Sequence, residues 1–296
     1  MAIKGRRTRG AINTLLLGLM LGASTVASAD DLPDSMTVTL GGDMIGPYHA
    51  LAGPHDPAFD RIATLFKTAD IGFSNQEGSI FDLDGFTGFP APETGGGYPR
   101  QVTSFAAELR AMGINIVSKA NNHATDWGVA GLVATLETLG KADLVSAGAG
   151  LDAASAIGPA YRETGKGKVA LVSTATTFPL MSLPAGPVTR YGQTSRPGPG
   201  ISAIHAHPVR LVTAQQLAAL RAIAGPIGMT AGAGGADVRI ADQIFRAAVQ
   251  PGLTWEAKPE DVSAVMASLK EARAGANLVI FTIHAHETAG MTDEMP

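Results

Sequence analysis

The chain has 296 residues, of which 45% are apolar and none is cysteine, and its formal net charge is −4 at pH 7. That length can bury a sizeable core, arranged as one large domain or two small ones. The small net charge is spread along the chain, so no basic face for nucleic acid is predicted. A chain without cysteine has no disulfides, and its stability must come from its core.

The first 29 residues are predicted to be a secretory signal peptide. A basic segment at 1–10 precedes an apolar segment at 11–27, and small residues precede Asp30, which is the three-part layout of such a signal. The alternative is a transmembrane anchor, but Asn13 and several glycines interrupt an apolar run that is short for a span. We expect cleavage near Ala29 and export to the bacterial periplasm or cell surface.

After Asp30, strand-like and helix-like segments alternate, with no linker that divides residues 30–296. The predicted strands are 36–42, 71–77, 114–120, 168–174 and 276–287, and the predicted helices are 57–69, 104–112, 127–140, 213–224 and 259–273. Stretches rich in glycine, proline and small residues predict loops at 81–102, 191–208 and 225–237. The alternation indicates an α/β protein with a largely parallel sheet.

Four of the predicted strands end in polar side chains that can bind a metal or move a proton. These are Asp43 after the first strand, Asn75 and Glu77 in the second, Asn122, His123 and Asp126 after the third, and His284, His286 and Glu287 in the last. Open α/β folds bind ligands at the carboxyl ends of their strands. Carboxylate, amide and imidazole groups together suit Mn²⁺, Fe²⁺, Zn²⁺ or Mg²⁺. The pattern predicts a site for one or two divalent ions.

Structural explanations exist for the same residues taken singly. Asp43 could cap a turn, Asn75 could satisfy loop backbone, and Asp126 could be the N-cap of the helix that begins at Trp127. In the catalytic interpretation, His123 is a general acid whose other ring nitrogen is held by Asp126, three residues on.

Several segments together resemble the CapA family of poly-γ-glutamate capsule-biosynthesis proteins, which is similar to the calcineurin-like metallophosphoesterases. They are LGGDMIG at 40–46, ADIGFSNQEGSI at 69–80, KANNHATDWGVAGLVATLETLG at 119–140 and SAGAG at 146–150. The specific part is the Asn-Asn-His block followed by Asp-x-Gly and a Thr-Leu helix. The resemblance implies a metallophosphatase-like α/β/β/α sandwich, with a metal site at the strand ends. It also implies a role in making or exporting an anionic capsule polymer, with capsule-synthesis membrane proteins as partners.

The resemblance also implies roles for individual residues. By its motifs, Asp43 is a ligand of the first metal and Glu77 a ligand near the bridging position. Asn122 is a ligand of the second metal, His123 the general acid, and His284 a ligand from the late strand.

This chain departs from the family pattern in two places. The family has histidine, Trp-Gly and then glutamate where this chain has HAHE at 284–287, so either His284 or His286 is the ligand. The family continues to a further glycine-histidine motif, which is not reached by Pro296. We interpret the sequence as a fragment, because a fold that ends just after a core strand leaves a sheet edge unfinished.

Substrate contacts are predicted for Asn75, Arg100 and Glu287. The loop at 81–102 is a candidate rim, because long loops beside a site often cover it. Its Arg100 could meet a carboxylate or phosphate, with a solvated arginine as the alternative. The His-x-His pair His205 and His207 could be a ligand pair, but no carboxylate is close in sequence. It is predicted to be surface or loop packing, with a contact to substrate as the alternative.

Three functions remain open on the sequence alone. The first is an exported metal-dependent hydrolase of a phosphoester or amide bond. The second is a non-catalytic or weakly catalytic component of anionic polymer synthesis, export or anchoring. The third is an unrelated exported α/β binding protein whose polar loops hold a small ligand. A polymer-associated, metallophosphatase-like protein is ranked first. The choice between enzyme and accessory component stays open, since fold does not establish chemistry.

Overall fold

The computed structural model describes residues 35–45, 51, 56–226, 237–241 and 243–287. The predicted signal peptide lies outside the described residues, as does most of the predicted loop at 225–237. Within the part of the chain that is described, no helix combines the length and apolar character needed to cross a membrane.

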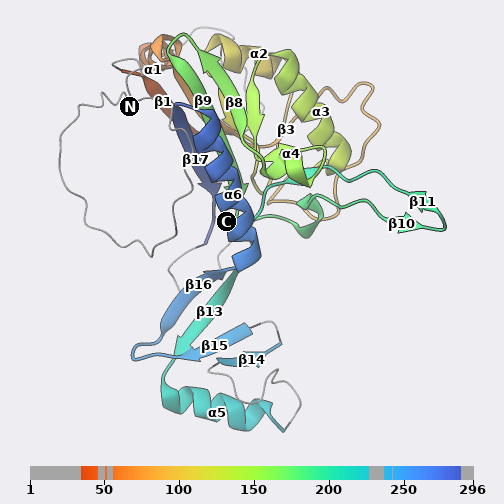
Figure 1. Ribbon diagram of the computed structural model, residues 1–296, viewed down its shortest axis with the longest axis vertical. Coiled ribbons are helices and arrows are strands. Elements are labelled where there is room, and N and C mark those ends of the chain that lie inside the picture. Colours follow the sequence, from red (N-terminus) through yellow and green to blue (C-terminus); the bar gives the residue numbers. More distant parts are fainter. Residues whose placement is uncertain (1–34, 46–50, 52–55, 227–236, 242, 288–296) are drawn as a thin grey trace.

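Two sheets stacked face to face form the centre of the molecule (Figure 1). The first contains β1 (Val38–Met44), β2 (Ile71–Gln76), β5 (Ile116–Ser118) and β6 (Val145–Ala147), in that order and all parallel. The second has the order β17 (Leu278–His284), β9 (Gly167–Ala175) and β8 (Ala160–Thr164), with β17 parallel and β8 antiparallel to β9. Buried side chains of both sheets pack together between them, including Phe73, Ile116 and Leu171.

Helices cover the outer face of each sheet. The first sheet is covered by α1 (Pro57–Thr68), α2 (Ser104–Ala111) and α3 (Gly128–Lys141), which share a core with Val117. The second is covered by α6 (Pro259–Gly275). Strand β9 shows why both faces are apolar: Val169 and Leu171 face the first sheet, while Ala170 and Val172 face α6, since successive side chains point to opposite sides. The predicted α/β/β/α sandwich is therefore confirmed.

The part of the chain between β12 and α6 in the sequence forms a smaller lobe that projects from the sandwich (Figure 1). Its sheet has the order β14 (Asp237–Ile240), β15 (Gln243–Ala247), β13 (Ala206–Val212) and β16 (Gly252–Ala257), and it carries α5 (Ala214–Ala224). The remaining elements are β3 (Ser79–Ile80), β4 (Arg100–Gln101), β7 (Ala149–Gly150), α4 (Ala153–Ile157), β10 (Thr189–Arg190), β11 (Gln193–Thr194), β12 (Gly200–Ile201) and a 3₁₀ turn at Leu180–Ser182.

The prediction of a loop over 191–208 was wrong. This stretch contains half of the β10–β11 hairpin, β12 and the start of β13. Pro208 lowers strand propensity because it has no backbone N–H. It is accommodated because pairing of β13 with β15 begins only at Val209, one residue later.

Candidate metal centre

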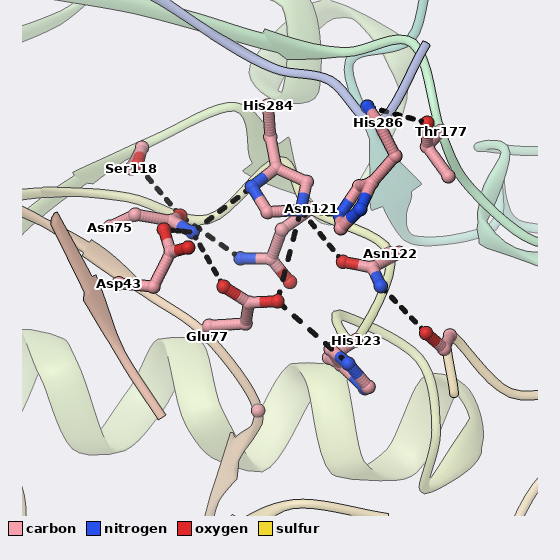
Figure 2. Close-up of polar contacts among 12 residues, drawn as sticks. Asp43, Asn75, Glu77, Ser118, Asn121, Asn122, His123, Thr177, His284 and His286 are labelled. Atoms are coloured by element: carbon pink, nitrogen blue, oxygen red, sulfur yellow. Dashed lines mark hydrogen bonds and ion pairs between the residues drawn. The ribbon is translucent and has the colours of Figure 1, made fainter. Parts of the chain in front are cut away.

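The polar side chains at the strand ends form one cluster, as Figure 2 shows. In the first sheet, Asp43 of β1 lies in register with Asn75 of β2, and Asn75 with Ser118 of β5. The β1–β2 register shifts between Leu40 and Asp43, and such a bulge re-aims the side chains that follow it. His284 enters from the other sheet, as the last residue of β17. Parallel pairing thus brings together groups that are far apart in sequence.

Asp43, Glu77 and His284 form a candidate metal site. One ligand atom from each can be chosen so that all three lie within 4.8 Å of one another. Bonds of about 2.0–2.2 Å to one ion place its ligand atoms within about 4 Å of each other, so small side-chain rotations would complete the set. Two carboxylates and an imidazole are donors that divalent transition metals accept. The residues present therefore fit a divalent cation.

Asn75 lies at the centre of this group. Its amide nitrogen donates to Asp43 Oδ1 at 2.8 Å and to Glu77 Oε2 at 3.2 Å, and it lies 3.3 Å from His284 Nδ1. A neutral donor between two carboxylates offsets their mutual repulsion. The predicted contact of Asn75 with substrate stays a prediction, and its described contacts are with the candidate ligands.

Asn121 fixes the orientation of Asn75 and was not predicted to be part of the site. Its amide nitrogen donates to the backbone oxygen of Gln76 at 3.0 Å and to Asn75 Oδ1 at 3.1 Å. The Ser118 hydroxyl donates to the same Oδ1 at 2.8 Å. Because a backbone carbonyl only accepts, the Asn121 amide cannot be reversed without losing this bond. The signal in the sequence was the first asparagine of the Asn-Asn-His block.

His123 and Asp126 form a buried pair beside the candidate ligands. His123 Nδ1 lies 2.6 Å from Asp126 Oδ2, and the other ring nitrogen lies 3.8 Å from Glu77 Oε1. Asp126 is fully buried and its Oδ1 accepts the backbone N–H of Gly95 at 2.9 Å. The alternative that Asp126 caps α3 was wrong, because the N-cap is Trp127 and no side chain caps the helix. The Asp126 carboxylate instead bonds to the His123 ring and to the backbone N–H of Gly95.

Asn122 and His286 contact Nε2 of His284, whereas Asn75 lies next to the other ring nitrogen. Asn122 Oδ1 is 2.8 Å from His284 Nε2, while its amide nitrogen donates to the Gly95 carbonyl at 2.6 Å. His286 lies just beyond β17, where its backbone N–H donates to the Thr177 hydroxyl, and its Nε2 is 3.0 Å from His284 Nε2. Of the two histidines, His284 is the one that joins the three-residue group. The roles of Asn122 and His286 as ligands stay predictions.

Burial shifts the pKa values of two candidate ligands in opposite directions. Burial, and then the charge of Asp43, raise the pKa of the Glu77 carboxyl to about 7. Burial, with smaller effects from His286 and His123, lowers the pKa of His284 to about 4. The imidazole is therefore neutral and able to bind a metal at pH 7, whereas Glu77 is close to half protonated.

We expect metal binding to weaken as the pH falls from 8 to 6. A divalent ion binds the carboxylate form of Glu77, so binding below about pH 7 must displace the proton of that carboxyl. Calorimetric titrations in buffers of different ionisation enthalpy would measure the released protons, with a value near one per ion at pH 6 that approaches zero by pH 8.5. An affinity that does not change between pH 6 and 8 would contradict a ligand role for Glu77.

Lys119 holds the backbone on either side of Glu77 and was also not predicted to be part of the site. It is fully buried, and its ammonium donates to the backbone oxygens of Gln76, at 3.3 Å, and of Gly78. These residues flank Glu77, whose own carbonyl accepts from Gln101 at 3.1 Å. Burial lowers the pKa of Lys119 to about 7. Nothing in the sequence marked this lysine, because its function depends on carbonyls of another strand.

The other predicted substrate residues are engaged in local contacts. Arg100 donates to the Phe81 carbonyl at 2.8 Å and stands over the Phe81 ring, 5.7 Å from its centre. Glu287 accepts from the hydroxyls of Thr176 and Thr177 at 2.6 and 3.3 Å. Both contacts tie down loops around the site, and a direct role with substrate stays a prediction.

His205 and His207 lie at the start of the lobe. His205 Nδ1 is 2.6 Å from Asp261 Oδ2 of α6, and His207 Nε2 is 3.8 Å from Glu256 of β16. Carboxylates that are distant in sequence are therefore close in space. These contacts join the start of the lobe to α6 and β16, and the packing role stays a prediction.

An α/β/β/α sandwich with carboxylate, amide and imidazole groups gathered at its strand ends is the arrangement of a metallophosphatase-like fold. The family model for the bacterial capsule synthesis protein PGA_cap matches residues 37–292, and the chain belongs to this family. It is similar to two uncharacterized proteins of Sinorhizobium fredii, y4uA and y4sH. Each is 33% identical over 273 residues, which is 91% of this chain and 58% of the relative. The chain thus spans a little over half the length of these curated relatives.

Proposed function

We propose that this protein is an exported, metal-dependent hydrolase that acts on a phosphoester or amide bond in an anionic capsule polymer. Membership of a capsule synthesis family supports an anionic capsule polymer as the substrate, and the predicted signal peptide supports export. The observation that carries the hydrolase is the position of the His123–Asp126 pair, with His123 Nε2 3.8 Å from Glu77 of the candidate metal group.

A divalent ion held by Asp43, Glu77 and His284 would supply an activated water and neutralise charge on the bond being cleaved. The residues of the chain account for the rest of the chemistry. Asp126 accepts from Nδ1 of His123 and fixes the orientation of the ring, which leaves Nε2 facing the site. His123 can then give a proton to the leaving group from that nitrogen. Asn122 fixes the His284 ring through Nε2.

Two substitutions separate metal binding from proton transfer. Asp43→Ala is expected to lose the bound metal together with all turnover. His123→Ala is expected to keep the metal and to lose turnover by about 100-fold or more, since a positioned general acid contributes about 10²–10⁴ in rate. Metal content would be measured by mass spectrometry, and turnover with p-nitrophenyl phosphate and with poly-γ-glutamate. Glu137→Ala, which removes an exposed carboxylate from α3, is the matched control.

Two results would contradict the proposal. One is a metal content that Asp43→Ala leaves unchanged, which would remove the site assignment. The other is a wild-type protein that binds polymer but shows no metal-dependent turnover. That result would favour the non-catalytic component of polymer synthesis.

A further inference from the structure

A long section of this acidic protein carries only positive charge. The 73 residues from Thr164 to Ala236 contain six lysines and arginines and no aspartate or glutamate, although the whole chain has a net charge of −4. Lys166 and Lys168 pair with Asp70 and Glu163, so a cation of this section that faces an anionic partner must be one of the others.

Two of these cations lie on an exposed hairpin, residues 185–198, which we call the arm. Hydrogen bonds between the backbones of Ala185 and Gly198, at 2.7 and 3.2 Å, begin its ladder, which continues into β10 and β11. All four residues of these two strands are exposed, and Tyr191 at the turn is 98% exposed. Figure 1 shows the arm extending away from the sandwich. It contributes little to the core, so packing does not explain its composition.

The segment just before the arm is hydrogen-bonded to the segment that carries His123 and Asp126. The Ser182 hydroxyl, three residues before the arm, lies 2.5 Å from the hydroxyl of Thr125. Thr125 stands between His123 and Asp126 in the sequence. On the other side of the arm, β12 pairs with β7. The arm therefore starts beside the residues that are proposed to transfer the proton, and leads outward from them.

Arg190 and Arg196 present their charge to solvent. Both residues are exposed, and within the described ranges no salt bridge joins either guanidinium to a carboxylate. An arginine fork binds carboxylate or phosphate in two-pronged fashion, and the Tyr191 ring beside them offers an apolar face for a polymer backbone.

We propose that the arm binds an extended polyanion and holds it across the mouth of the candidate metal centre. This inference rests on the proposed function for its substrate but adds a separate binding surface. The ligand is a chain of carboxylates or phosphates long enough to reach from the site to Arg190 and Arg196. A short anion that fills only the metal site would not touch the arm.

The test compares Arg190→Ala/Arg196→Ala with Arg61→Ala/Lys67→Ala. The control removes two positive charges from exposed positions on α1. Binding of fluorescent poly-γ-glutamate, of polyphosphate and of neutral dextran would be measured at 50 and 300 mM salt. The arm variant is expected to bind a long polyanion about tenfold more weakly at 50 mM salt, with a smaller difference at 300 mM. The control should stay within about twofold of wild type. The difference between the two polyanions identifies which anion the arm prefers.

Trimeric glutamate and p-nitrophenyl phosphate separate the arm from the metal centre. The arm variant is expected to keep wild-type metal content and wild-type activity on both short compounds. Equal losses in the arm and control variants, dextran binding as tight as polyanion binding, or wild-type affinity in the arm variant would each overturn the proposal. If the wild type binds polymer through the arm but has no turnover, the arm stands and the hydrolase falls.

Discussion

Gly95→Ala is expected to lower metal-dependent turnover by about 100-fold. A Cβ atom at this position would lie 2.3 Å from the carbonyl oxygen of Asn122 and 2.4 Å from its carbonyl carbon, so the two backbones would have to separate. Gly95 also donates its N–H to Asp126 and accepts from the Asn122 amide. The separation would therefore displace the partner of His123 and a candidate ligand at once. A displacement of about 1 Å at a catalytic group can cost about 100-fold in rate.

The control for this substitution is Gly140→Ala. A Cβ at Gly140 meets no atom within 4 Å, and the position lies inside α3. Alanine there is expected to raise the free energy of unfolding by about 0.5–1 kcal/mol and to leave turnover unchanged. Both variants would be assayed for turnover, metal content and urea-induced unfolding. Wild-type turnover in Gly95→Ala would show that the loop at 81–102 does not position the site.

The sequence located the candidate ligands because they follow a simple rule. Parallel strands end at one edge of a sheet, so Asp43, Glu77 and Asn122 had to converge once the strands were recognised. His284 could be added because its apolar strand, at the far end of the chain, also reads as parallel. The strand pattern predicted only one largely parallel sheet, and the sandwich of two sheets was predicted from the family resemblance.

The supporting residues could not be found in this way. Asn121 and Lys119 donate to backbone carbonyls of another segment, and the backbone of Gly95 bonds to the side chains of Asn122 and Asp126. Their partners depend on how strands and loops pack, which no local pattern records. The lobe was missed for a related reason: β13 pairs in parallel with β15, whose residues lie more than thirty positions further on, and Pro208 weakens the local strand signal.

Lys119→Met is expected to change how stability depends on pH. Burial lowers the pKa of Lys119 from 10.5 to about 7 in the folded protein. Between pH 7 and about 10.5 the unfolded chain therefore binds more protons at this position than the folded chain does. The wild-type free energy of unfolding gains a contribution that rises with pH in this window, by up to about 1.4 kcal/mol per pH unit. The variant lacks that contribution.

Urea denaturation of both proteins at pH 7.5, 8.5 and 9.5 would measure the difference. We expect the stability of wild type relative to Lys119→Met to increase by about 2 kcal/mol over this range. Lys141→Met, which changes an exposed lysine on α3, should run parallel to wild type, and parallel curves for Lys119→Met would contradict the burial of this amine.

The buried lysine lowers the free energy of unfolding near neutral pH. A methionine would avoid that cost but could not donate the hydrogen bonds that the lysine makes. The Lys119 amine supplies donors to the carbonyls of Gln76 and Gly78, on either side of Glu77. In Lys119→Met the Gln76 carbonyl keeps its bond from Asn121, whereas the Gly78 carbonyl loses the amine, and an unsatisfied buried carbonyl costs about 1–3 kcal/mol. Lys119→Met is therefore expected to weaken metal binding as well, because the residues on either side of Glu77 would each lose a bond that holds the backbone in place. Metal affinity at pH 9, where the folded lysine is neutral and still donates, separates the two effects: a difference that persists there comes from these hydrogen bonds and not from the charge.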